Sequence, residues 1–246
     1  MDQASELKLM ELRFWTPEFF DPQIARRLKI MLDRLSRAYL SYLEIPLKFK
    51  NTNVILYSVI NLDYSKLNKR DREQFYSLGN LNDYIGGSSL LIAEKKLLDL
   101  HDEDRRKFLV DEIHLSLKNY VIHTNSGSVE ELDRAHKSLI NANYFSGYSK
   151  VYASGKITCQ IESRENFGSA DYRLSVKAHE TGEVKAYDIA RKDYPFFDEM
   201  SGITQHDILD YPQTFNPIKW EGKNFVMYWG KEKYIFDPET KRILME

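Results

Sequence analysis

The sequence predicts an α+β fold in which an N-terminal α/β part packs on a C-terminal antiparallel β meander. The N-terminal part combines strand patterns with roughly three to four helical patterns, and hairpins replace helices near residues 143–149. Beyond that point the strand patterns are short and are joined by turns such as Thr181-Gly182, which is typical of antiparallel hairpins. We therefore expect a helix-rich part at residues 1–145 and a β-rich part at residues 146–246, as separate domains or as one continuous domain.

The N-terminal part is organised around residues 86–123. A short apolar strand is predicted at residues 89–93, and a charged connector joins it to the most regular amphipathic helix. Acidic residues 102–104 suit the start of this helix, because negative charge interacts favourably with its exposed N–H groups. The glycine pair Gly86-Gly87 is interpreted as a turn with room for positive φ. Apolar residues at helical spacing predict the buried stripe of the helix: Val110, Ile113, Leu117 and Val121.

Three further elements of this part follow from local patterns. Residues 7–15 alternate in polarity and predict a strand. Asp21-Pro22 predicts the start of a helix that ends near residue 43, since Asp caps a helix and Pro fits its first position. Residues 53–62 are nearly all apolar, which predicts a strand covered on both faces.

The remaining elements complete the chain. Residues 66–78 are weakly helical, and residues 128–131 match a capping box that opens a helix ending near residue 142. Residues 193–216 interrupt the meander with several Xaa-Pro pairs and are too long for a hairpin turn. The strand patterns of the β-rich part are residues 148–161 with a turn at Ser154-Gly155, 172–178, 184–190, 225–229, 233–236 and 242–245.

The composition excludes several classes of protein. Acidic and basic residues nearly balance (37 against 35, net charge −2), which argues against a general nucleic-acid binder. The single cysteine, Cys159, excludes an intrachain disulfide framework and a Cys-rich zinc site, and it is interpreted as a small buried apolar residue. The chain shows no secretory signal pattern, and no apolar run approaches the ~20 residues that cross a bilayer. We expect a soluble, cytoplasmic protein that does not enter the membrane.

Aromatic and acidic side chains gather in the irregular segment at residues 193–216. The candidate binding residues are Tyr194, Phe196, Phe197, Asp198, Glu199, Asp207, Asp210 and Tyr211. Aromatic residues anchor many protein interfaces, and acidic side chains suit a basic partner and repel nucleic-acid phosphates, although the same aromatics could instead fill the core of the meander. The leading hypothesis is an intracellular, non-catalytic protein-binding protein, of which an immunity or antitoxin-like inhibitor is one concrete version.

A metal-dependent hydrolase or nuclease is the alternative. In such enzymes an Asp and a Glu-x-Lys pair on neighbouring strands hold Mg²⁺ and orient the attacking water. Asp83 with Glu94 and Lys96 fits this pattern if the latter two end a strand, and Asp171 with Glu183 is a second match. Because acid-x-base triplets arise by chance in a highly charged chain, the pattern alone does not establish catalysis.

Histidine and acidic pairs are the remaining candidates for metal binding or acid–base chemistry. His114 is predicted to face solvent without partners, on the same side of its helix as Asp111. His206 and Asp210 are spaced to share a face of a short predicted helix. Neither pair has an evident third ligand, so the sequence predicts no metal and no cofactor.

Overall fold

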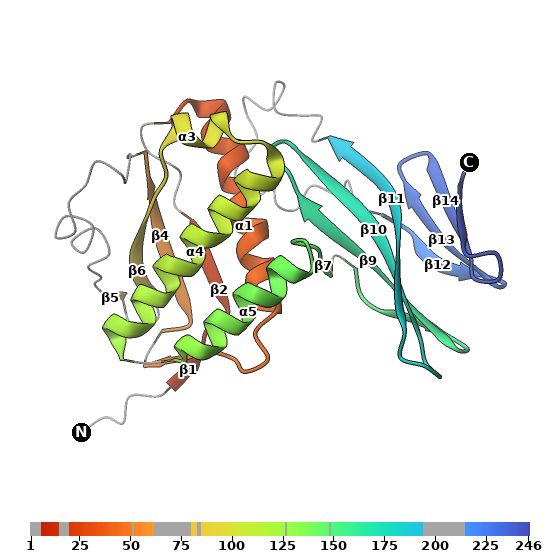
Figure 1. Cartoon of the computed structure of the whole chain (residues 1–246), viewed down its shortest axis with the longest axis horizontal. Coiled ribbons are helices and arrows are strands. Elements are labelled where there is room, and N and C mark those ends of the chain that lie inside the picture. Colours follow the sequence, from red (N-terminus) through yellow and green to blue (C-terminus); the bar gives the residue numbers. More distant parts are fainter. Residues whose placement is uncertain are drawn as a thin grey trace. The chain divides into compact units, whose positions relative to one another are not determined.

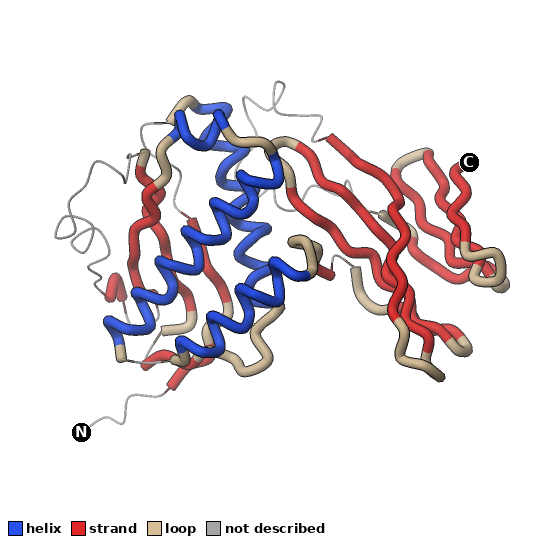
Figure 2. Tube along the Cα trace, in the orientation of Figure 1, coloured by secondary structure: helices blue, strands red, loops and turns tan. Residues whose placement is uncertain are grey.

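The computed structural model confirms the α+β class (Figure 1). The structure describes residues 6–14, 20–50, 52–61, 80–82, 85–125, 127–147, 149–193 and 215–246. The chain divides into two units: the first comprises Met1–Phe145 and Glu165–Phe167, and the second comprises Ser146–Arg164 and Gly168–Glu246. Among the described residues, all helices belong to the first unit, and strands build the second (Figure 2).

The first unit contains a mixed sheet with the order β2 (Glu11–Phe14), β4 (Val54–Ile60), β6 (Ile85–Leu91) and β5 (Asn80–Asn82). Strands β2, β4 and β6 run parallel, and β5 is antiparallel to β6. Parallel neighbours need a crossover connection, and helix α1 supplies the one between β2 and β4.

Residues 7–15 do not form the single strand that their polarity predicts. Strand β1 (Glu6–Lys8) pairs with β3 (Lys48–Lys50) in a separate antiparallel pair, whereas β2 belongs to the mixed sheet. Between the two strands, the backbone N–H of Leu9 donates to the Leu47 carbonyl at 2.8 Å. The segment is therefore divided because its two halves have different hydrogen-bond partners.

Three long helices pack together: α1 (Pro22–Ser41), α4 (Asp102–Thr124) and α5 (Val129–Asn141). Of these, α1 contacts β2 and α4 contacts β6 of the mixed sheet. The predicted starts are confirmed, because the Asp21 carboxylate accepts hydrogen bonds at the start of α1 and the Ser128 hydroxyl accepts one at the start of α5. Asn125, in the left-handed conformation (φ 47°), ends α4. Within the described residues, no helix is both long and apolar enough to cross a membrane.

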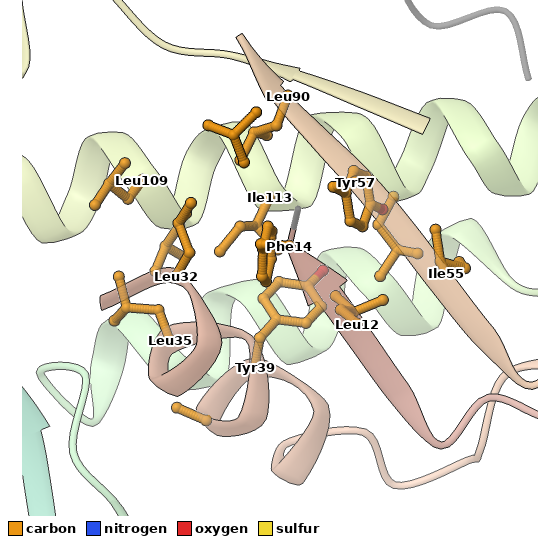
Figure 3. Close-up of a cluster of buried hydrophobic side chains, with 14 of the residues drawn as sticks. Leu12, Phe14, Leu32, Leu35, Tyr39, Ile55, Tyr57, Leu90, Leu109 and Ile113 are labelled. Carbon is orange, nitrogen blue, oxygen red and sulfur yellow. The ribbon is translucent and has the colours of Figure 1, made fainter. Parts of the chain in front are cut away.

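The predicted apolar stripes form one core with one face of β4. Figure 3 shows Leu32 and Tyr39 of α1 close to Ile113 of α4 within this cluster. On β4, alternate residues from Ile55 to Val59 are at most 1 % exposed, whereas Ser58 on the opposite face is exposed. The expectation that this strand is covered on both faces therefore holds only in part, because the packed helices fully bury one face and Leu56 and Ile60 on the other face are partly buried.

Gly86 and Gly87 lie inside β6 rather than in a turn, and neither has a positive φ. The physical reason is a close approach from α4. A Cβ atom on Gly86 would lie 2.1 Å from the hydroxyl oxygen of Tyr120 and 2.8 Å from its Cζ atom. Tyr120 is 2 % exposed, and its ring packs edge-on against Phe49. The missing side chain therefore allows α4 to lie directly on β6.

The second unit consists of two antiparallel sheets. One has the order β11 (Val184–Asp193), β10 (Ser169–Ala178), β9 (Ile157–Glu165) and β7 (Ser146–Gly147), and β8 (Tyr152–Ser154) also pairs with β9. The other has the order β12 (Ile218–Glu221), β13 (Asn224–Trp229), β14 (Glu232–Asp237) and β15 (Arg242–Met245). Residues of both sheets share one apolar core, which contains the fully buried Cys159 as predicted.

Replacing Gly86 with Ala is expected to lower the free energy of unfolding by about 1–3 kcal/mol, because the added methyl group overlaps the buried Tyr120 ring. Urea unfolding measures the change. In a Tyr120→Phe background the same substitution should cost less, because the nearest atom is gone. A Gly86→Ala variant as stable as the wild type would show that α4 does not approach β6 this closely.

Candidate functional site

The predicted binding residues all lie outside the described residues: Tyr194, Phe196, Phe197, Asp198, Glu199, Asp207, Asp210 and Tyr211. His206, the candidate partner of Asp210 for metal binding or acid–base chemistry, also lies outside the described residues. The two flanks of the segment are described. Lys192 lies near the end of β11, and Phe215 precedes β12.

Lys192 and Phe215 contact the same two aromatic rings. The Lys192 ammonium group lies 5.7 Å from the ring centroid of Trp229 and 5.6 Å from that of Tyr234, and it donates a hydrogen bond to Glu232. The Phe215 ring centroid lies 5.0 Å from that of Trp229 and 5.7 Å from that of Tyr234. We name these five residues the aromatic anchor. It brings the two flanks of the predicted binding segment to one place.

The aromatic anchor combines burial with a compensated charge. Phe215 and Tyr234 are buried, and the Lys192 side chain is 17 % exposed. The Tyr234 hydroxyl donates to the Glu232 carboxylate at 2.6 Å. Hydrogen bonds from Lys192 and Tyr234 hold the pKa of Glu232 below its usual range, so this carboxylate remains charged near neutral pH. An ammonium group over aromatic faces gains cation–π attraction in addition to its ion pair.

Glu94 and Lys96 begin helix α3 (Glu94–Asp99) and do not end a strand. The Glu94 carboxylate accepts a hydrogen bond from the backbone N–H of Asp21 at 3.1 Å, and the Lys96 ammonium lies 4.1 Å from the ring centroid of Phe108. Side chains two positions apart on a helix do not face each other, so the expected strand-end geometry is wrong. Asp83 lies outside the described residues, and the three-residue hydrolase site stays a prediction.

The second hydrolase pattern fails on strand register. In the β10–β11 hairpin, Asp171 pairs with Arg191, whereas Glu183 precedes Val184, which pairs with Lys177. Lys177 lies six positions after Asp171 on β10, which corresponds to about 20 Å of strand. The two carboxylates therefore lie too far apart to share one metal ion.

His114 faces the interface between helices, which corrects the prediction that it faces solvent without partners. Its Nδ1 atom lies 2.7 Å from the Tyr39 hydroxyl oxygen, and its Nε2 atom lies 3.1 Å from Oδ1 of Asp133. Its ring stacks on that of His136, with centroids 4.3 Å apart and an interplanar angle of 18°. The Nε2 atom of His136 lies 2.8 Å from Oδ1 of Asp111. We name these five residues, contributed by α1, α4 and α5, the histidine cluster.

The hydroxyl group of Tyr39 has one proton and two acceptors within reach. These are Nδ1 of His114 and the carbonyl oxygen of Leu132, which lies 2.9 Å away. When His114 is neutral, both of its ring nitrogens are satisfied if Tyr39 donates to Nδ1 and the Nε2–H group donates to Asp133. When His114 is protonated, Nδ1–H donates to Tyr39, and Tyr39 donates to Leu132. The ring can therefore gain a proton without losing a hydrogen bond.

Burial and neighbouring charges set the protonation of the histidine cluster. Burial lowers the pKa of His114, and the nearby His136 acts in the same direction, against the opposing effect of Asp133. The Lys118 ammonium donates to both carboxylate oxygens of Asp133, at 2.8 and 3.0 Å, which lowers the pKa of Asp133. At neutral pH the cluster therefore contains a neutral His114 beside an ionised Asp133.

The geometry of the histidine cluster favours proton binding over metal binding or catalysis. Stacked rings hold their nitrogen lone pairs in nearly parallel planes, so the lone pairs of His114 and His136 do not converge on one ion. Within the described part of the chain, no group of three or more His, Cys, Asp or Glu side chains could hold a metal ion. Tyr39 is fully buried, so a substrate does not reach its hydroxyl group. Titration is the chemistry that this arrangement supports.

Glu112 of α4 is a second titratable group that the sequence patterns do not single out. Its Oε2 atom is buried and has no hydrogen-bond partner among the described residues. Burial raises the pKa of Glu112 to about 7, and Lys96 opposes this effect. A carboxyl group with this pKa is partly protonated at neutral pH, which is unusual for glutamate.

Cys159 is not an activated nucleophile. Burial raises the pKa of its thiol to about 12, so the thiolate is scarce at neutral pH. The interpretation of Cys159 as a small buried apolar residue is confirmed.

The sequence contains one signal that points to the His114–His136 pair. The two residues lie at equal sequence distances from Asn125, where α4 ends, and α5 follows after a short connection. Two helices joined in this way are neighbours that run antiparallel, so positions at equal distances from the turn meet. The stack is therefore predictable from the pairing of the two helices and not from the residue pattern within either helix alone.

Comparison with known protein families, with curated proteins and with solved structures gives no match to this chain. The fold and the two sites therefore carry the functional argument. They define an α+β protein with the histidine cluster in its first unit and the aromatic anchor in its second.

Replacing Tyr39 with Phe is expected to lower the free energy of unfolding at pH 7.5 by about 1–3 kcal/mol, because Nδ1 of the half-buried His114 loses its donor. Urea unfolding measures the effect. Tyr187→Phe is the matched control, because this partly exposed tyrosine lies on β11 in the other unit. Equal stabilities for Tyr39→Phe and the wild type would contradict the hydrogen-bond assignment.

Replacing Glu112 with Gln is expected to stabilise the protein at pH 8 and to change little at pH 4. The pKa of Glu112 in the folded state, about 7, lies above the ordinary value of 4.5. The folded state therefore binds this proton more tightly, and the resulting stability is fully present below pH 4.5 and is lost as the pH rises through 7. A neutral amide avoids this loss, which is worth about 1–3 kcal/mol.

Urea unfolding at the two pH values measures the effect of Glu112→Gln. Glu103→Gln, an exposed position on the same helix, is the control and should leave the stability unchanged at both pH values. The same gain for the two variants at pH 8 would show that burial of Glu112 is not the cause.

Proposed function

We propose that the protein is an intracellular, non-catalytic binder of another protein and that residues 193–216 carry its binding face. The observation that supports this proposal is the aromatic anchor, which holds Lys192 and Phe215 on Trp229 and Tyr234. A segment whose two ends are fixed at one place has less conformational freedom to lose on binding than a segment with separated ends. Binding residues are commonly carried by such segments on a rigid scaffold.

The residues of the segment indicate the chemistry of the partner. Aromatic side chains bury large areas at little entropic cost, and four acidic residues lie among them: Asp198, Glu199, Asp207 and Asp210. This combination suits a protein with a basic surface, whereas it repels nucleic-acid phosphates. An immunity or antitoxin-like inhibitor is the concrete version that we propose, because such inhibitors are small proteins that often present acidic and aromatic faces.

A photo-crosslinking amino acid at position 197 tests the proposal in native cells. We expect one protein adduct from Phe197 and none from Val184, an exposed control position (58 %) in the same unit. The adducted protein should carry a basic surface patch. Equal labelling from both positions, or no adduct from Phe197, would contradict the proposed face.

Charge reversal gives the matched comparison for the same adduct. Asp198→Lys with Glu199→Lys should reduce the Phe197 adduct by roughly tenfold or more, since electrostatic complementarity accelerates association. Glu180→Lys with Glu183→Lys reverses two exposed acids at the far end of the β10–β11 hairpin and should leave the adduct unchanged. A similar loss for both pairs would indicate a general charge effect instead of the proposed face.

A further inference from the structure

The stacked His114–His136 pair brings two proton-binding groups to the seam between α4 and α5. One ring comes from each helix, and the ring centroids lie 4.3 Å apart. The His114 side chain is 14 % exposed and the His136 side chain 21 %, so water screens the pair only partly. We propose that this pair is an acid-operated switch, in which the native packing holds one proton and a second proton separates α5 from α4. The proposal is independent of the binding function proposed above.

The groups around the pair can accommodate a first proton on either ring. Charged and titratable groups reach the pair from each helix of the cluster: Tyr39 from α1, Asp111 with its partner Lys107 and Lys118 from α4, and Asp133 from α5. Tyr144, beyond α5, interacts with Asp111. With both rings neutral, the two carboxylates and the two ammonium groups balance. A proton on either ring lies beside a carboxylate, and on His114 it costs no hydrogen bond because Tyr39 reverses its donation.

The second proton is repelled by the first. Each carboxylate of the cluster already has a lysine partner, Lys118 on Asp133 and Lys107 on Asp111. Two protonated rings would therefore add two positive charges to a balanced and partly buried seam. Stacked face to face, they repel each other at a distance where little water intervenes. We therefore expect the second proton to bind more weakly than the first, as coupled sites do.

Separation of α5 from α4 is the movement that relieves this repulsion. The two rings belong to different helices, so an increase in the distance between the helices moves the charges apart and admits water. Movement of α1 would not separate the rings, because α1 contributes only Tyr39 to the cluster.

Hydrogen exchange of the backbone amides in α5 tests the switch. After correction for intrinsic exchange rates, protection of α5 should fall by roughly tenfold or more between pH 7.5 and pH 4.5, which is the signature of local opening. Protection of β13 in the second unit should stay constant. Protonation of Glu112 favours the folded state over this range, so it does not imitate the effect.

Variants test whether protonation of the His114–His136 pair causes the opening of α5. His136→Phe keeps an aromatic ring stacked on His114 but cannot take up a proton, so the protection of α5 should no longer depend on pH. His136→Gln gives the same test if the Phe variant does not fold. His123→Phe, at an exposed position of α4, should behave as the wild type. Constant α5 protection in the wild type, or an unchanged pH-dependent fall in both His136 variants, would overturn the proposal.

Discussion

The buried hydroxyl group of Tyr39 is the contact on which the first unit depends most. Tyr39 lies in the last turn of α1 and is fully buried (Figure 3). Its oxygen lies 2.7 Å from Nδ1 of His114 on α4 and 2.9 Å from the carbonyl oxygen of Leu132 on α5. Apolar packing alone would allow the three helices to slide, because it is not directional, whereas this shared hydrogen bond fixes one relative position. The stack of His114 on His136 follows from that position.

The second unit uses a comparable arrangement at the aromatic anchor. A single charged group, the Lys192 ammonium, lies among aromatic rings with its counterion, Glu232, at its side. In both units, a polar group in a mostly apolar surrounding makes a unique set of contacts, and its loss would leave an uncompensated partner. The two sites differ in what they can do. The histidine cluster contains a ring, His114, that can gain a proton without losing a hydrogen bond, whereas the Lys192–Glu232 pair keeps its charges near neutral pH.

Local patterns predict this structure well where the decisive interaction is local. Asp21 and Ser128 accept hydrogen bonds within their own first turns, so the starts of α1 and α5 follow from the sequence. The position of Gly86 inside a strand does not follow from the local sequence. The side chain that requires a glycine there is Tyr120, a residue far along the chain on another element. The partial burial of the second face of β4 does not follow from the sequence for a related reason: apolar composition does not reveal how many layers cover a strand.

The candidate sites show the same division between local and long-range information. His114 was predicted to face solvent because its helix was considered alone, and its true partners come from α1 and α5. The aromatic anchor joins Lys192 to Trp229 and Tyr234, and no local pattern links these positions. In contrast, the acidic and aromatic character of residues 193–216 is a property of composition, and the sequence alone suffices to propose it.

Nitrogen NMR of the His114 imidazole ring tests the central claim most directly, because the chemical shifts of the two ring nitrogens report where the proton is. At neutral pH the account predicts an unprotonated Nδ1, which accepts from Tyr39, and a protonated Nε2, which donates to Asp133. On acidification Nδ1 should take up the proton while Nε2 keeps its own. A neutral ring with its proton on Nδ1 would contradict the hydrogen-bond scheme that joins the three helices.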